Sequence, residues 1–347
     1  MAYNFFPVDR EQMYLFPPSL KDWVPEGDLS WFILDAVGEM DLQTFYEGYR
    51  LDGLGGKGYE PAMMVSLLLY SYCLGERSSR RIEWLCQRDV GFKVVAANQV
   101  PDHSSIARFR QDHEEKMTVL FKQVLRLCAG AGVVKVGVVA VDGTKIKGNA
   151  ALDANRTKES IDSEVEKMFA EAAAKDEEED RLLERVLDTV REILPEAQVG
   201  VFLGDAGYWS KAVGEAGAAG PELLVATTKD WKQRKAAREA PPPHGRIPKD
   251  LSARDRMERK PLTQRGRRLY KIRGKTVEPV FGQVKDARGC DRFMRRGKGA
   301  CDSEWKLIAA THNLLKLYRS GKRTARKSPG TDGGELNRRP EGLKKAA

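Results

Sequence analysis

Three carboxylates stand at positions where a metal-dependent reaction could use them. Asp142 directly follows an apolar, β-branched run over residues 133–141, and Asp205 follows a second apolar run over residues 199–203. Both runs predict buried strands. Because open α/β sheets bind ligands at the carboxyl ends of their strands, we expect the two aspartates to meet at one sheet edge. The third carboxylate, Glu278, lies in a basic region and precedes a proline, which is typical of a helix start.

Three converging carboxylates repel one another unless cations neutralise them. Two Mg²⁺ or Mn²⁺ ions about 3.5–4 Å apart would do so, and such a pair activates an attacking water or 3′-hydroxyl in phosphodiester chemistry. The five cysteines form no CxxC pair and the four histidines form no HxxxH pair, which argues against zinc. Each carboxylate also has an ordinary explanation. An aspartate after a strand is a common turn residue, and the helix dipole stabilises a glutamate in the first turn.

The charge of the chain is unevenly distributed. Residues 231–347 hold 33 Lys and Arg against 12 Asp and Glu, a net of +21, which leaves residues 1–230 with 26 against 38, a net of −12. A basic half beside an acidic half indicates a polyanion partner such as DNA, although a solvated basic surface with a basic tail is the alternative. No stretch approaches the ~20 apolar residues of a membrane helix, and the start lacks a secretory signal. We therefore predict no membrane partner and a cytoplasmic location.

Residues 1–134 have a mostly helical pattern. Apolar residues at helical spacing predict a helix over residues 61–73. Serines 78 and 79 can cap a following helix, and the Pro-Asp-His-Ser run at residues 101–104 opens another.

Arg108 and Arg110 are expected on the exposed side of the helix that starts near residue 103. Two short helices with outward arginines are compatible with a DNA-binding helix-turn-helix. They are also compatible with an ordinary helical bundle, and the pattern alone favours the bundle. We predict that both arginines contact DNA.

The second half of the chain alternates between charged helical patterns and basic loops. Further elements are predicted from spacing and composition: a strand extension or partner strand over 144–147, a long helix or helical pair over 158–194, a loop over 240–250, a helix from about 276, a last helix over 303–317 and a disordered tail over 321–347. Glu278 and Lys285, seven residues apart, lie almost in line on the predicted helix. One helix can therefore offer a metal ligand and a cation for a DNA phosphate.

Several motifs along the chain belong together. They occur at residues 15–20, 78–83, 101–110, 141–145, 205–208, 277–285 and 304–315. With these motifs the chain resembles bacterial insertion-sequence transposases of the DDE class that have an InsH-like N-terminal region. The resemblance implies an α/β fold, with an RNase H-like catalytic domain after a helical N-terminal domain. It also implies cleavage and strand transfer at the inverted-repeat ends of an insertion sequence, by a homodimer on DNA.

The resemblance assigns roles to individual residues. It implies that Asp142, Asp205 and Glu278 are the catalytic residues and bind two Mg²⁺ or Mn²⁺ ions. It implies that Tyr270, Arg273 and Lys285 hold the transposon-end DNA. The spacing departs from the strictest family pattern at one point, because the gap from Arg273 to Glu278 is one residue longer.

The resemblance also divides the chain into three parts. Residues 1–134 would form the DNA-binding domain, residues 135–320 the catalytic domain, and residues 321–347 a basic tail.

One segment departs from the family pattern. The resemblance implies two further strands between the first and second aspartates, but residues 148–198 are highly charged and helical in pattern. We predict that the catalytic domain is internally shortened between about residues 181 and 199. Its sheet would then be incomplete, with an unpaired edge, and the protein would bind DNA but cleave it poorly or not at all. The alternatives to an active enzyme are a catalytically inactive remnant that only binds DNA and, more weakly, a transcription regulator built on the N-terminal helices.

Overall fold

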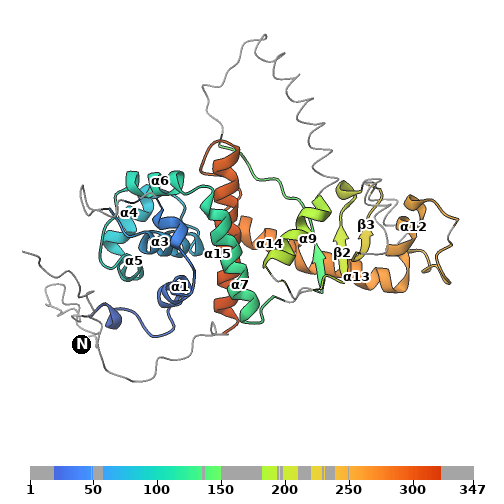
Figure 1. The fold of residues 1–347 in the computed structure, drawn as a ribbon, viewed down its shortest axis with the longest axis horizontal. Helices are drawn as coiled ribbons and strands as arrows, with labels where there is room; N and C mark the ends of the chain where they lie inside the picture. Colours follow the sequence, from blue (N-terminus) through green and yellow to red (C-terminus); the bar gives the residue numbers. More distant parts are fainter. Residues whose placement is uncertain are drawn as a thin grey trace, which may run out of the picture.

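The structure is a computed structural model that describes residues 19–47, 49, 58–134, 137–149, 182–193, 195, 198–209, 220–228, 230, 239–248 and 250–321. The N-terminal helices lie on one side of the molecule and a small sheet lies on the other, with α14 (Glu278–Gly282) between them (Figure 1). Within the described part, no helix is long and apolar enough to cross a membrane.

A helical body surrounds one almost completely buried helix. Its elements are η1 (Leu20–Asp22), α1 (Leu29–Gly38), α2 (Gln43–Tyr46), α3 (Pro61–Cys73), α4 (Ser79–Arg88), α5 (Val90–Val95), α6 (His103–Asp112) and α7 (Lys116–Gly130). Every residue of α3 except Ala62 is buried, and α1, α2 and α5 pack around it. The helix predicted over residues 61–73 is therefore confirmed, because a starting proline and a continuous apolar run fix both its bounds and its central place.

The two helices whose arginines suggested a helix-turn-helix are α4 and α6, and α5 lies between them along the chain. A single residue, Asp89, separates α4 from α5, and residues 96–102 separate α5 from α6. A helix-turn-helix needs a turn of about three or four residues between its two helices. Asp102 caps α6 by accepting bonds from the amides of Ser104 and Ser105. The helices share one apolar core, and the choice between a bundle and a DNA-binding unit stays a prediction.

The sheet has three parallel strands in the order β1 (Val138–Ala140), β2 (Val201–Gly204) and β3 (Glu222–Val225). The first two strands occupy parts of the two predicted runs, whereas β3 was not predicted. The strand predicted over residues 144–147 is wrong. Lys147 forms only an isolated bridge with Arg292, because this segment leaves the sheet and runs beside a loop near the C-terminus.

Helices cover both faces of the sheet. The helices of this part are α9 (Leu182–Ile193), η2 (Ala206–Tyr208), α12 (Ala253–Arg259), η3 (Lys260–Leu262) and α13 (Gln264–Thr276). They are followed by α14 (Glu278–Gly282) and the π-helical η4 (Gln283–Ala287), from which Val280 and Val284 pack in the core of the helical body. Phe202 packs in a cluster with Met257 of α12 and Val186 of α9, whereas Leu203 packs in a cluster with Leu269 of α13. Successive strand residues thus face opposite sides, and α13 lies along one face of β2.

The last helix, α15 (Lys298–Arg319), packs against α3 and α7. Figure 1 shows α7 and α15 side by side, and Leu307, Ile308 and Leu314 share one apolar core with the N-terminal helices. This helix therefore belongs by its packing to the helical body, although the sequence order groups it with the second predicted domain. The boundaries predicted after residues 134 and 320 stay predictions. The predicted tail from residue 322, and the predicted helical segment over residues 158–181, lie outside the described residues.

Candidate active site at the ends of two parallel strands

The register of β1 and β2 places the two aspartates side by side. Ala140 is the partner of Leu203, and the amide of Val141 donates to the carbonyl of Leu203 at 2.9 Å, which continues the ladder. The same register carried two residues on brings Asp142 opposite Asp205. Neighbouring parallel strands lie about 4.8 Å apart, so two carboxylates meet at the carboxyl edge of the sheet, as the sequence predicted.

One arginine bridges this pair. The Nη2 atom of Arg273, on α13, lies 2.8 Å from Oδ2 of Asp142 and 3.5 Å from Oδ2 of Asp205. The side chains of Arg273 and Asp142 are only 13% and 16% exposed, whereas that of Asp205 is 39% exposed. Burial opposes the charge of Arg273, but Tyr270 and the two aspartates outweigh it and raise the pKa of the guanidinium. The shared cation therefore compensates the repulsion between the two carboxylates.

Tyr270 and Lys285 make contacts within the protein. The Tyr270 hydroxyl donates to the carbonyl of Gly204 at 3.2 Å, at the end of β2. The Lys285 ammonium donates to the carbonyl of Lys145 at 2.7 Å, just beyond the first aspartate. Both side chains therefore border the carboxylate pair, and both hold the backbone around it.

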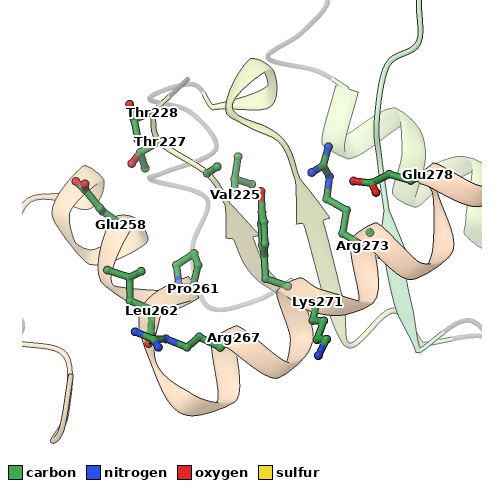
Figure 2. A pocket seen from close by; sticks show the side chains of 13 residues that line it. Val225, Thr227, Thr228, Glu258, Pro261, Leu262, Arg267, Lys271, Arg273 and Glu278 are labelled. Atoms are coloured by element: carbon green, nitrogen blue, oxygen red, sulfur yellow. The ribbon is translucent and has the colours of Figure 1, made fainter. Parts of the chain in front are cut away.

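Glu278 stands nearby but apart from the aspartate pair. It is exposed, occupies the first turn of α14, and folds back over Gly274, where an added Cβ would lie 3.6 Å from its Oε1. A cavity of about 860 Å³ lies against α13, and Figure 2 shows Arg273 and Glu278 at one end of it and Leu262 at the other. The structure thus brings two of the three predicted carboxylates together and leaves the third beside them.

The donor set fits a divalent cation in type, and the aspartate pair fits it in place. Carboxylate oxygens are the ligands that Mg²⁺ prefers, and Asp142 and Asp205 already share one positive partner. Among the described residues, no three His, Cys, Asp or Glu side chains lie close enough together to hold a metal ion. Glu278 stands apart from the pair, and the guanidinium of Arg273 contacts one oxygen of each aspartate. A divalent ion would have to replace it there.

The two predicted DNA-binding arginines of α6 have different surroundings. Arg108 is exposed, as expected. The expectation that Arg110 is exposed is wrong, because its side chain is only 8% exposed. It donates to the Tyr72 hydroxyl at 3.1 Å, to the Arg77 carbonyl at 2.8 Å and to the Ser79 hydroxyl. A residue four positions after Ile106 shares its buried face, and that spacing could have predicted the burial of Arg110.

Two family models match the chain. Residues 18–112 match the model described as "Transposase domain (DUF772)", and residues 243–318 match the model described as "Transposase DDE domain". These matches support an insertion-sequence transposase of the DDE class. No curated protein and no solved structure matches it. The resemblance seen in the motifs is therefore confirmed.

The matched segments of this transposase cover part of the candidate site. The DDE segment contains Tyr270, Arg273, Glu278 and Lys285, and it implies an RNase H-like fold, with which the small parallel sheet is compatible. DDE transposase domains generally use divalent metal ions and act on DNA. The two aspartates lie outside both matched segments, so their place in the site follows from the register of the strands.

Sequence reasoning missed one feature of the transposase that bears on DNA. Arg268, Lys271 and Lys275 form an exposed row on α13, on the side away from Leu269 and the sheet. Their spacing of three and four residues would have predicted this row if the bounds of α13 had been known.

Proposed function

We propose that this transposase cleaves DNA at the ends of an insertion sequence and joins the freed 3′-hydroxyl to target DNA. The observation that carries the proposal is the adjacent, in-register pair of Asp142 and Asp205, which shares one cation at the carboxyl edge of a sheet. Adjacent carboxylates at such an edge are a liability for stability unless a positive ligand uses them. The DDE family match supports that use.

The three carboxylates divide the work in this proposal. Asp142 and Asp205 bind the metal, and Glu278, exposed on the neighbouring helix, completes the ligand set when DNA is bound. A divalent ion there supplies an activated water or 3′-hydroxyl and stabilises the leaving oxygen, with Mg²⁺ or Mn²⁺ and two ions as the proposed identity and number. Water adds to the scissile phosphorus, the P–O3′ bond breaks, and the 3′ oxygen leaves as a hydroxyl after taking up a proton. The freed hydroxyl then attacks a target phosphodiester in line.

Arg273 has two roles in this scheme. Without metal and DNA it neutralises Asp142 and Asp205. When a metal ion takes its place between them, its guanidinium becomes available for a phosphate of the transposon end, which it can bind through two parallel hydrogen bonds. Tyr270 and Lys285 stay beside it and line the path of the same strand.

The outward row of α13 is the proposed surface for the rest of the DNA backbone. Arg268, Lys271 and Lys275 are exposed and span about 10 Å along the helix at 1.5 Å per residue. Cations at this spacing can neutralise successive phosphates and release counterions. Changing Lys271 and Lys275 to alanine should therefore reduce the salt dependence of DNA affinity by about one slope unit for each lost contact. The exposed Lys316 of α15, changed to alanine, is the matched control.

The helical body offers a second proposed DNA surface. On α4 the exposed Trp84 carries the guanidinium of Arg81 at 4.0 Å and that of Arg88 at 5.0 Å from its ring. Arg108 of α6, exposed on the helix packed against α4, adds a further cation. The proposed surface keeps Arg108 and leaves out Arg110, which is buried and whose two Nη atoms donate to protein groups. As in other DDE transposases, we propose that two subunits bridge two ends.

The decisive experiment measures Mg²⁺-dependent nicking of short DNA duplexes. Each duplex carries an inverted-repeat end of the insertion sequence, taken from the DNA that flanks the gene. Asp142→Asn should reduce nicking to background while DNA binding in a gel shift stays unchanged. Asp188→Asn is the matched control, because Asp188 is exposed on α9 and pairs only with Arg191 among the described residues. Nicking by Asp142→Asn at the level of the unchanged chain would reject the assignment.

A second candidate function has its own observation. Within the described residues β1 has three residues and pairs only with β2, so one edge of the sheet has no described partner. This is compatible with an internally shortened domain that binds DNA without cleaving it. Salt-dependent DNA binding together with absent nicking in both Mg²⁺ and Mn²⁺ would favour that remnant. Strand transfer by the unchanged chain would exclude it.

A further inference from the structure

A nearly inaccessible ion pair lies under the loop that links η4 to α15. We call this loop, residues 288–297, the strap. Beneath it, Arg77 from the turn before α4 contacts Glu304 of α15 at 3.0 Å, and their side chains are 8% and 0% exposed. The same guanidinium donates to the strap carbonyls of Gly289 at 2.8 Å and Arg292 at 2.6 Å. A buried ion pair is tolerated only when further hydrogen bonds satisfy both partners.

The carboxylate of the pair is satisfied by the strap as well. Glu304 accepts hydrogen bonds from the backbone amides of Met294 at 3.0 Å and Arg295 at 3.1 Å. The Arg295 side chain in turn reaches Ser303 at 2.9 Å and pairs with Glu114 after α6. The inner edge of the strap is therefore bound along its length to groups that the helical body holds in place.

The outer edge of the strap pairs with the chain that follows the first aspartate of the candidate site. The Lys147 amide donates to the carbonyl of Asp291 at 3.0 Å, and the Phe293 amide donates to the carbonyl of Lys147 at 2.9 Å. The Lys147 ammonium lies 3.1 Å from the Asp291 carboxylate. Asn149 adds a side-chain bond to the carbonyl of Met294 at 2.9 Å. This segment stands where an added strand was expected, and the strap takes the place of a strand partner.

A third contact joins the helical segment of Glu278 to the same chain. Lys285 of η4 donates to the carbonyl of Lys145 at 2.7 Å, three residues after Asp142. The strap begins directly after η4, so its anchorage also fixes the end of the segment that starts at Glu278. The flanks of two candidate metal ligands therefore meet on the strap.

We propose that the buried Arg77–Glu304 pair is a positioning device that sets Asp142 relative to Glu278 by holding the strap against the helical body. The proposal rests on the proposed function only in naming these carboxylates as metal ligands. Its physical basis is that fork-shaped Arg77 and bidentate Glu304 bind the strap backbone at four points, two carbonyls and two amides. Such geometry fixes both place and orientation.

The pair also joins the two segments that the family models match. Arg77 lies in the segment over residues 18–112, whereas the strap and Glu304 lie in the segment over residues 243–318. The helical body is thus part of the support of the candidate site, in addition to any DNA that it binds.

The test uses the full chain with Arg77→Met and Glu304→Met together. Removing both charges avoids a buried unpaired ion, so the helical body stays folded while the strap loses its four anchors. The control changes Lys306 and Asp302 to methionine, an ion pair on the same helix that makes no described contact with the strap. Hydrogen exchange is followed in the peptides that cover residues 143–149 and 288–297, and Mn²⁺ affinity is measured with an end duplex bound, the state in which Glu278 completes the ligand set.

In the double variant we expect hydrogen exchange at least tenfold faster in both peptides and unchanged in α3. Its Mn²⁺ affinity should be about tenfold weaker. Faster exchange in the strap alone, with residues 143–149 still protected, would overturn it. Unchanged Mn²⁺ affinity would overturn it as well. If the double variant fails to fold, Arg77→Lys keeps the charge but loses the fork and should give a smaller change in the same direction. If Asp142→Asn leaves Mn²⁺ affinity unchanged, the proposed function fails, and the exchange of residues 143–149 still decides whether the pair holds this segment.

Discussion

Arg273→Met should tighten the binding of Mn²⁺ to the transposase in the absence of DNA. Methionine keeps much of the length of the side chain and removes its charge. In the unchanged chain the guanidinium lies between Asp142 and Asp205. A metal ion that binds there has to displace it, so the metal and Arg273 compete for the same oxygens.

The magnitude follows from the geometry of the two contacts. The contact with Asp142 is 2.8 Å long between largely buried groups, and a hydrogen bond to a charged group contributes about 1.5–3 kcal/mol. The contact with Asp205 is 3.5 Å long and more exposed, so solvent screens it and it adds little. Each ~1.4 kcal/mol corresponds to a factor of ten in affinity. Arg273→Met should therefore raise Mn²⁺ affinity by about 10- to 100-fold.

Titration calorimetry at low ionic strength measures this change directly. Arg268→Met is the matched control, because Arg268 lies on the exposed side of the same helix, and its Mn²⁺ affinity should equal that of the unchanged chain. Adding Asp142→Asn to Arg273→Met should remove the gain. Unchanged or weaker Mn²⁺ binding in Arg273→Met would refute the competition, and would show that the arginine supports the metal site.

Three further predictions concern stability. Arg77→Met alone leaves the carboxylate of Glu304 buried and unpaired and should lower the free energy of unfolding by about 3–5 kcal/mol; urea denaturation should show a smaller loss when Glu304→Met is added. Gly266→Ala should lower the free energy of unfolding by about 1–3 kcal/mol, because an added Cβ would lie 1.9 Å from the carbonyl oxygen of Lys260. Gly274→Ala is the control: its added Cβ would lie 3.6 Å from the nearest atom, so its thermal unfolding should be nearly unchanged. Burial, followed by Arg288, Lys316 and Arg319, lowers the pKa of His312 to about 4. The unfolded chain then binds more protons than the folded one between pH ~6.5 and 4, so the free energy of unfolding should fall as the pH drops through this window. The fall should be smaller in His312→Gln. The same fall in that variant, measured over a pH series, would contradict the reasoning.

The sequence by itself determined the features that depend on neighbours along the chain. Pro61 and the apolar run after it fix α3, because helix starts and apolar periodicity are local properties. The ends of two strands on Asp142 and Asp205, and the start of a helix at Glu278, are local in the same way. The motifs were enough to indicate the transposase family, since they consist of short runs whose residues and order can be read directly.

Only the tertiary structure decided how these pieces meet. The register that sets Asp142 beside Asp205 joins residues 63 positions apart, and no local pattern specifies such a pairing. The sequence predicted that Arg273 binds DNA, which stays a prediction, and only the fold showed that it bridges both aspartates from α13. Arg110 was expected at the surface, but its charge is satisfied inside the helical body. Long, flexible cationic side chains take their partners from whatever the fold brings near them, and for that reason their roles follow from packing across the chain and not from their place in the sequence.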